Sequence, residues 1–358
     1  MLTAEDKSTL ITCPPPSSQQ PAWRKALAAA VTDPAELLSL LGLDPALLPA
    51  ARKAHQRFRV RVPRGFIERM RPADPDDPLL RQVLPVAAEL EEVDGFSADP
   101  VGDDAATLGP GLLSKYAGRA LFIATGACAV NCRYCFRREY PYDTGLAVAA
   151  DWAPALRQLD QLPGVSELIL SGGDPLVLGD DRLRILSNAL LARPAIRRLR
   201  IHSRLPIVLP ERIDDSFLGW VTSLPVPLVM VVHANHAREI NQPVIEAMDA
   251  MRRAGATVLN QSVLLAGVND SGEALVELSE ALFSCGVLPY YLHMLDRVRG
   301  AAHFEVPESR ALELARTMAA RLPGYLVPRL VREVPGAPAK TLLDLAPIAE
   351  TVTLGGAV

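Results

Sequence analysis

The chain carries the sequence Gly-Ala-Cys-Ala-Val-Asn-Cys-Arg-Tyr-Cys-Phe-Arg-Arg from Gly126 to Arg138, and this stretch bears most directly on fold and chemistry. Cys128, Cys132 and Cys135 lie in the spacing C-x3-C-x2-C and supply three thiolates. Zinc sites and iron–sulfur clusters usually take four protein ligands. A [4Fe–4S] cluster held by three thiolates therefore keeps one iron open for a small-molecule ligand. The alternative is a structural zinc site whose fourth ligand is a distant histidine.

The composition limits the class of protein. The chain has 358 residues, of which 49% are hydrophobic, enough for one large domain or two ordinary ones. A formal net charge of −4 argues against a nucleic-acid surface as its main feature. The first twenty residues contain no apolar signal segment, and no stretch reaches the length of a membrane span. Five cysteines, three of them clustered, favour thiol chemistry over a disulfide framework. We therefore predict a cytoplasmic protein that binds neither nucleic acid nor membranes.

Four segments can be distinguished along the chain. Residues 1–20, with their run of prolines, are predicted to form a flexible lead. Residues 21–112 show a helical pattern interrupted by Pro and Asp, which predicts a mostly helical N-terminal region. Residues 113–325 alternate short apolar runs with amphipathic stretches, and residues 326–358 form a separate C-terminal segment.

The alternating part predicts an α/β fold with a parallel sheet. Its apolar runs show little polar alternation, as expected of strands buried on both faces. These runs are Ala120–Ala124, Glu167–Leu170, Leu199–Ile201, Leu228–Val232, Thr257–Leu265 and Val287–Leu292. The helices predicted between them include Asp181–Leu191, Glu211–Val221, Glu239–Arg253 and Glu273–Cys285. Six such βα repeats predict a partial (β/α)6-type barrel rather than a doubly wound sheet.

Polar side chains lie at or just beyond the end of each predicted strand. They are the three cysteines, Ser171–Asp174, His202 with Arg204, His233 with Asn235 and His236, Asn260–Ser262, and Tyr290–Asp296. Functional groups of parallel barrels gather at the carboxyl ends of the strands, so we expect one shared site. Four of these residues are predicted to hydrogen bond to a cofactor: His202, His233, Asn235 and Gln261. The alternatives are ordinary strand-end polar groups or ligands of a second metal.

The cysteine spacing, with Tyr134 before the third cysteine, resembles that of radical S-adenosylmethionine (SAM) enzymes. In that family the amine and carboxylate of SAM occupy the open iron. Ser171, Gly172, Gly173 and Asp174 resemble the family's glycine-rich motif for the SAM amino group. Backbone carbonyls at the glycines would accept hydrogen bonds from the ammonium, and Asp174 would add negative charge. Without that context the same residues would form an ordinary strand-to-helix turn.

Further motifs resemble lysine 2,3-aminomutase, a family of radical SAM enzymes that depend on pyridoxal phosphate (PLP). The similarity runs from about residue 57 to residue 345 and includes Asp76–Val83, the cysteine stretch, Ser171–Leu176, Asn260–Leu265, Gly267–Asp270 and Pro289–Tyr291. Three motifs resemble the branch that serves elongation factor P: Cys128–Arg138, Leu199–Pro206 and Gly300–Phe304. In that branch the enzyme makes (R)-β-lysine, which a separate ligase attaches to a lysine of the translation factor.

The resemblance implies roles for single residues. The three cysteines would bind the cluster, Lys340 would hold PLP through its amine, and Arg119 would lie near the PLP phosphate. Arg137 would bind the substrate α-carboxylate, while Asp296 and Glu333 would hold the distant ammonium of lysine. The family has aspartate at the second acid, so Glu333 keeps the charge on a longer arm. The sequence Pro-Gly-Ala-Pro-Ala before Lys340 replaces a run of glycines and implies a stiffer loop.

The resemblance predicts an isomerase that converts L-α-lysine to (R)-β-lysine with a [4Fe–4S] cluster, SAM and PLP. It implies an electron donor such as flavodoxin or ferredoxin, and a functional link to elongation factor P and its lysyl ligase; a homodimer stays open. One alternative is a free-standing lysine 2,3-aminomutase of catabolism or antibiotic synthesis. Another, of a different class, is a non-catalytic iron–sulfur or zinc-binding protein that keeps the fold.

Overall fold

The computed structural model describes residues 20–142 and 152–345. The predicted flexible lead lies outside the described residues except for residue 20, and so does the chain beyond residue 345. Within the described ranges no helix is both long enough and apolar enough to cross a membrane.

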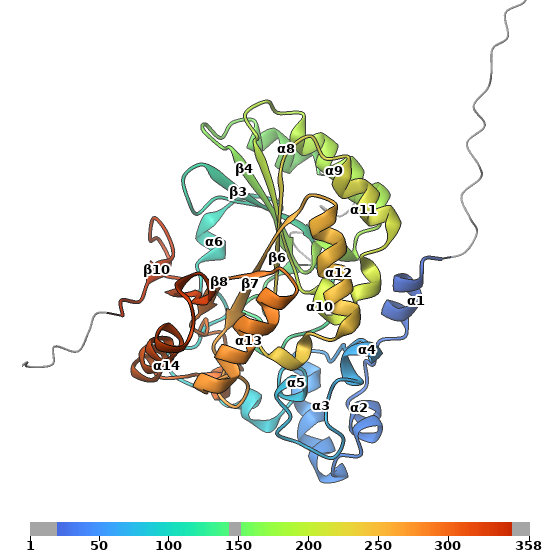
Figure 1. Ribbon diagram of the computed structural model, residues 1–358, viewed down its shortest axis with the longest axis vertical. Helices are drawn as coiled ribbons and strands as arrows, with labels where there is room; N and C mark the ends of the chain where they lie inside the picture. The colour runs from blue at the N-terminus through green and yellow to red at the C-terminus, as the bar shows by residue number, and fades with distance from the viewer. Residues whose placement is uncertain (1–19, 143–151, 346–358) are drawn as a thin grey trace, which may run out of the picture.

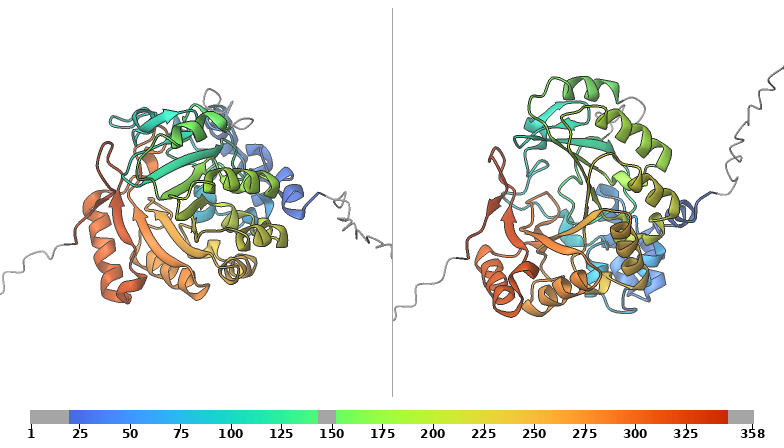
Figure 2. Two further views of the ribbon diagram at one scale, coloured as in Figure 1. Left: turned by 90° about the horizontal axis from the view of Figure 1, so that it is seen from above. Right: turned by 45° about the horizontal axis from the view of Figure 1, so that its top comes forward.

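Within residues 20–142 and 152–345, ten strands form a single open sheet in which the spatial order follows the chain order (Figure 1). Seven consecutive strands, β3 to β9, pair in parallel, and β1, β2 and β10 add antiparallel pairs at the two edges. The sheet is strongly curved (Figure 2). The strands are β1 (Thr107–Gly109), β2 (Leu112–Leu113), β3 (Arg119–Thr125), β4 (Glu167–Gly172), β5 (Arg198–Ser203), β6 (Leu228–Val232), β7 (Thr257–Val263), β8 (Leu288–His293), β9 (Arg329–Arg332) and β10 (Thr341–Leu342).

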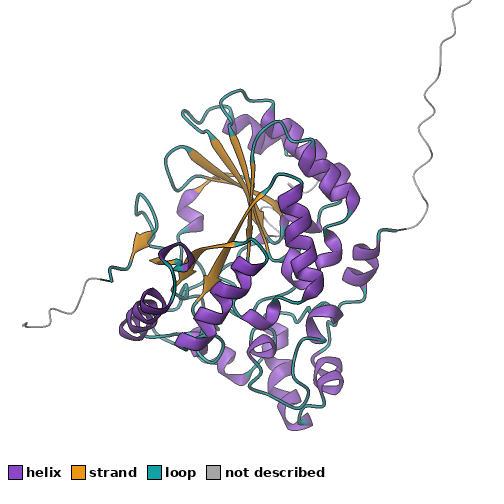
Figure 3. Cartoon of the chain, in the orientation of Figure 1, coloured by secondary structure: helices purple, strands orange, loops and turns teal. Residues whose placement is uncertain are grey.

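Helices follow the parallel strands and cover the outer face of the sheet (Figure 3). The longer ones are α8 (Ala153–Leu159), α9 (Asp180–Leu191), α11 (Asp215–Thr222), α12 (Gln242–Arg253), α13 (Gly272–Ser284) and α14 (Glu308–Arg321). Three of these helices start at a side-chain cap, which satisfies amide groups that have no partner inside a helix. Asp214 caps α11, Asn241 caps α12 and Ser271 caps α13.

The predicted partial barrel is confirmed, and all six predicted strands are present. The helix predicted from Glu211 differs, because a 3-10 turn at Pro210–Arg212 comes first and the Asp214 cap starts the helix at Asp215. The helix predicted from Glu239 likewise begins at Gln242, after the Asn241 cap. The seventh parallel strand, β9, was not predicted; it comes from the segment after residue 325 and joins the same sheet.

The N-terminal helices lie against the barrel (Figure 1). They are α1 (Ala22–Ala28), α2 (Pro34–Leu41), α3 (Leu48–Arg57), α4 (Arg64–Ile67), α5 (Pro78–Arg81) and α6 (Asp103–Ala106). Arg69 joins the two parts, since its Nη1 donates to the carbonyl oxygens of Ile207 at 2.7 Å and Glu239 at 2.8 Å. Arg238 reaches back to the buried Asp77 at 2.6 Å. Trp23 and Phe66 belong to the same apolar core as the barrel strands. The N-terminal region and the barrel therefore share one core, and the predicted boundary between them at residue 112 stays a prediction.

Candidate active site

One cavity of about 730 Å³ runs from the carboxyl ends of the strands into the barrel. It is lined by every predicted site residue except Asn235. The cysteine loop and Ser171–Asp174 lie at the strand ends, whereas Arg119 lies at the start of β3. The cavity therefore has two regions: the cysteines lie in one, and Arg119, Lys340 and the acids line the rest.

The loop that follows β3 and carries the three cysteines, residues 126–138 (the cysteine loop), packs at its start against Gly172 and Gly173 at the end of β4. A Cβ at Gly173 would lie 2.3 Å from the Ala127 carbonyl oxygen, and one at Gly172 would lie 2.5 Å from that of Thr125. Gly172 also has φ +115°, a conformation that L side chains rarely adopt. Only glycine at both positions lets β4 approach the loop this closely. The pair thus helps to position Cys128.

The three thiols face the same cavity in free form. Burial raises the pKa of Cys128 well above its usual value, and Cys135 raises it further. Burial and the neighbouring Cys132 raise the pKa of Cys135 to about 11. Coordination to iron would remove these protons, because a bound metal ion deprotonates its thiol ligands. In residues 20–142 and 152–345 no three His, Cys, Asp or Glu side chains are close enough to hold a single metal ion.

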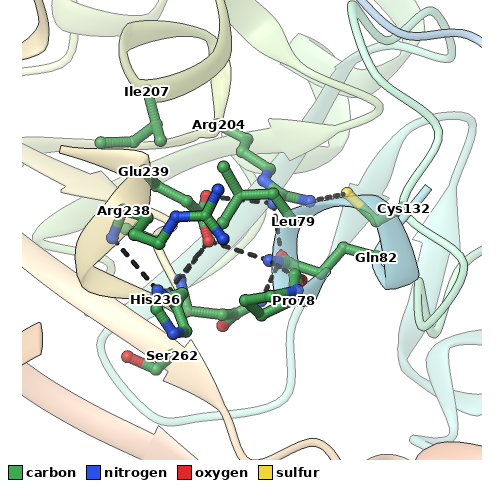
Figure 4. Close-up of polar contacts among 12 residues, drawn as sticks. Pro78, Leu79, Gln82, Cys132, Arg204, Ile207, His236, Arg238, Glu239 and Ser262 are labelled. Carbon is green, nitrogen blue, oxygen red and sulfur yellow. Dashed lines mark hydrogen bonds and ion pairs between the residues drawn. The ribbon is translucent and has the colours of Figure 1, made fainter. Parts of the chain in front are cut away.

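A buried guanidinium contacts one of these thiols (Figure 4). Arg204 Nη1 donates to Cys132 Sγ at 2.8 Å. Its Nη2 donates to Gln82 Oε1 at 2.6 Å and to Glu239 Oε2 at 3.1 Å. Arg204 follows β5, Gln82 follows α5, and Glu239 ends the 3-10 turn Ala237–Glu239, so three distant segments hold this group. The sequence showed Arg204 at a strand end but gave no sign of its partners.

Asn235 was predicted to bind a cofactor, and the structure places it outside the cavity. Its side-chain amide donates to Tyr134 Oη at 2.7 Å and to Gln82 Oε1 at 3.0 Å. Its Oδ1 accepts from the Val263 amide at 2.8 Å. The polar group is fully used within the protein, which explains why a polar residue can be buried at this strand end.

Asp174 lines the cavity, but its carboxylate is largely occupied. It accepts hydrogen bonds from the amides of Leu176, Arg204 and Leu205 and from Ser203 Oγ, at 2.7 to 3.0 Å. These bonds fix the chain after β4 to the chain after β5. The Asp174 carboxylate therefore holds these two segments together beside the cysteine loop.

A chain of opposite charges crosses the cavity wall next to β4. Arg137 Nε donates to Asp103 Oδ2 at 2.7 Å, and its Nη1 donates to Ser171 Oγ at 3.0 Å. Lys115 Nζ lies 2.7 Å from Asp103 Oδ1. Burial alone would raise the pKa of Asp103, but Arg137 and Lys115 lower it below its usual value. Asp103 was missed because an acid at a helix start is an ordinary sequence feature.

The second charged group surrounds Lys340. Its Nζ lies 2.5 Å from Glu333 Oε2, and Tyr116 Oη donates to Glu333 Oε1 at 2.5 Å. Burial alone would raise the pKa of Glu333, but Lys340 and the hydrogen bond from Tyr116 lower it below its usual value, which favours the carboxylate. Burial raises the pKa of Asp296 to about 7, with Lys340 lowering it and Glu333 raising it. The two predicted acids and the predicted lysine thus share one corner of the cavity.

The sequence of the chain is similar to that of known proteins. The radical SAM superfamily model matches residues 122–279. The L-lysine 2,3-aminomutase of Escherichia coli is 48% identical over 94% of this chain and 98% of its own length. That of Haemophilus influenzae is 43% identical over 89% of this chain and 95% of its own length, and that of Acetoanaerobium sticklandii is 30% identical over 89% and 77%.

The chain belongs to the L-lysine 2,3-aminomutase family.

Membership of this radical SAM family implies SAM and a [4Fe–4S] cluster, and the cavity offers unused polar atoms that such ligands could bind. Nε2 of His202 and Nε2 of His293 are buried without a hydrogen-bond partner in the described residues. Burial lowers the pKa of both imidazoles well below the usual value, so both rings are neutral. Burial lowers the pKa of His233 to about 3, and Gln261 Nε2 lies 3.2 Å from His233 Nε2. Buried polar atoms without partners are rare in folded proteins, and a bound cofactor would satisfy them.

The region of the cavity that Arg119, Lys340 and the two acids line fits an anionic aldehyde cofactor such as PLP. Arg119 and Arg329 line it and offer positive charge for a phosphate, whereas Arg200, which also lines it, is paired with Glu167 at 2.6 Å. Lys340, on the same cavity, is the amine that could bond to an aldehyde. The residues present therefore fit the group, as the family membership implies.

Proposed function

We propose that this protein is a PLP-dependent radical SAM lysine 2,3-aminomutase that converts L-α-lysine to (R)-β-lysine for attachment to elongation factor P. One observation carries the proposal: the three cysteines, Lys340 and the two acids Asp296 and Glu333 open into a single cavity. Radical generation, amine chemistry and recognition of a second ammonium group can thus take place on one bound molecule.

The cofactors would be held by the residues described above. The cluster on Cys128, Cys132 and Cys135 would supply the electron that cleaves SAM, and PLP, held by Lys340 until the substrate amine takes its place, would spread the unpaired electron of the substrate during nitrogen migration. All remaining steps require only that the protein fix both ends of lysine relative to these groups.

The acids explain why lysine would be the substrate. Without cofactor, the Lys340 ammonium is the partner of Glu333 at 2.5 Å. The ε-ammonium of a bound lysine would give Glu333 a cation in addition to Lys340. Asp296 adds a second carboxylate in the same corner, and proton loss there lets it bind the ammonium more strongly. A substrate without a distant positive charge would leave two buried carboxyl groups poorly paired.

Arg137 would bind the other end of the substrate. Its guanidinium is held by Asp103 and by Ser171, and it stacks 4.8 Å from the ring centroid of Phe136. Arginine held in this way can present its remaining N–H groups to a carboxylate without losing further side-chain freedom. Lys115 helps to fix Asp103, so two basic residues balance this acid.

The elongation factor P branch is supported by the three branch motifs in the sequence, whereas the free-standing enzymes remain the second candidate. The decisive assay supplies the reaction product and ATP to elongation factor P and its lysyl ligase, and measures modification of the factor by intact mass. Modification with enzyme-made β-lysine, and markedly less with α-lysine, is the expected result. An unmodified factor, although β-lysine is formed, would favour the free-standing function.

A further inference from the structure

Arg204 is the one cation in hydrogen-bond contact with a cluster cysteine among the described residues. It is 6% exposed, so water does not screen its charge. Its position is fixed from both ends. The backbone amide donates to Asp174 Oδ2 at 2.8 Å, and the guanidinium reaches Cys132, Gln82 and Glu239.

The surroundings direct the guanidinium toward sulfur. Glu239 Oε1 already accepts hydrogen bonds from the Asn235 and His236 amides and from Gln82 Nε2, so only Oε2 faces Arg204. Gln82 is itself fixed by donating to the Pro78 carbonyl at 3.0 Å (Figure 4). One buried positive charge is therefore shared between the Glu239 carboxylate on one side and the Cys132 sulfur on the other.

We propose that Arg204 is a positioning residue that sets the reduction potential of the iron–sulfur cluster through its hydrogen bond to Cys132; this rests on the function proposed above. Reduction moves one electron from the donor to the cluster, with no bond made or broken and no proton transferred. A fixed cation beside a thiolate ligand stabilises the more negative, reduced cluster. Hydrogen bonds to cluster sulfurs and local charge are among the factors that set such potentials.

Glu239 provides a test of the sign. The Glu239 carboxylate contacts Arg204 Nη2, whereas Cys132 contacts Nη1. Its negative charge partly offsets the positive charge of Arg204 near the sulfur, so Glu239 should lower the reduction potential. Removing the cation and removing the acid should therefore shift the potential in opposite directions. A purely structural role for the network predicts no such opposition.

The experiment is a redox titration followed by electron paramagnetic resonance on anaerobically reconstituted protein, without SAM or lysine. We expect Arg204→Gln to shift the reduction equilibrium at least tenfold toward the oxidised cluster, about 59 mV for a one-electron couple. Arg204→Lys should retain most of the wild-type potential, and Glu239→Gln should raise it.

Arg212→Met is the matched control. Arg212 is fully buried and ion-paired to Asp180 at 2.6 Å, but in the described part of the chain none of its hydrogen bonds goes to a cysteine. It should lose stability without a change in potential. Arg204→Gln removes the ion-pair partner of the buried Glu239 and could prevent folding. In that case the potentials of Arg204→Lys and Glu239→Gln test the inference. Shifts of less than threefold, or of the same sign in Arg204→Gln and Glu239→Gln, would overturn the inference while the proposed function stands. Wild-type protein that binds no cluster would overturn both.

Discussion

Replacing Gly173 by alanine should push the start of the cysteine loop away from the end of β4. The new Cβ would lie 2.3 Å from the Ala127 carbonyl oxygen, 2.7 Å from the Gly126 carbonyl carbon and 2.8 Å from the Ala127 carbonyl carbon. Contacts below 3.0 Å are essentially never seen for a Cβ, so loop and strand must separate by about 0.7 Å. All three atoms belong to the backbone, and no side-chain rotation relieves the overlap.

The cost follows from the hydrogen bonds at the same place. The Gly173 amide donates to the Thr125 carbonyl at 2.7 Å, and the Asp174 amide donates to that of Ala127 at 2.8 Å. Overpacking of this kind costs about 1–3 kcal/mol. Because the loop carries Cys128, we expect the loss to appear as reduced iron content after anaerobic reconstitution, together with a lower melting temperature.

Gly219 offers the matched control, since a Cβ there meets nothing within 4 Å. It lies inside α11, where Gly→Ala typically stabilises a helix by about 1 kcal/mol. Gly219→Ala should therefore keep full iron content and an equal or higher melting temperature. If Gly173→Ala kept wild-type iron content and stability, the argument that the glycine pair holds the cysteine loop would be refuted.

Three further changes test other parts of the cavity. Burial raises the pKa of Asp296 to about 7, so wild-type kcat/KM for lysine should rise as the pH increases through 7 and the carboxyl group ionises. Asp296→Asn should lower kcat/KM at least tenfold and remove that rise. If the variant kept the rise, the titrating group would be a different residue. Lys340→Ala should abolish the visible absorption of bound pyridoxal while iron content stays at the wild-type level; a persisting band would show that another amine binds the cofactor. Asn235→Ala should destabilise the fold by about 1–3 kcal/mol in thermal unfolding, because buried partners lose their hydrogen bonds; an unchanged melting temperature with weaker SAM binding would instead favour cofactor binding.

Much of the barrel could be predicted from sequence because its strands are buried on both faces. Runs such as Leu228–Val232 contain no polar residue, and the structure shows that strand with the same bounds. The strand β9 was missed because Arg329–Arg332 is charged at both ends and only four residues long. Its pairing with β8 depends on tertiary contacts that a local pattern does not reveal.

The site could be predicted where chemistry requires an unusual residue or where residues match motifs of the family. Three closely spaced cysteines stand out in any sequence, whereas Lys340 was identified through the family resemblance; both line the cavity. Asp103 and Lys115 do not stand out, because charged residues are common on protein surfaces, and only the fold brings them beside Arg137. Asn235 shows the opposite case, since a polar residue at a strand end was assigned to a ligand although its partners lie within the protein.

Whether this cavity isomerises lysine can be measured directly from the reaction products. Anaerobically reconstituted protein is given PLP, SAM, a strong reductant and L-α-lysine, and the products are separated by chiral chromatography. We expect (R)-β-lysine. Cleaved SAM without any β-lysine would contradict it, because the radical machinery would then work on a different substrate.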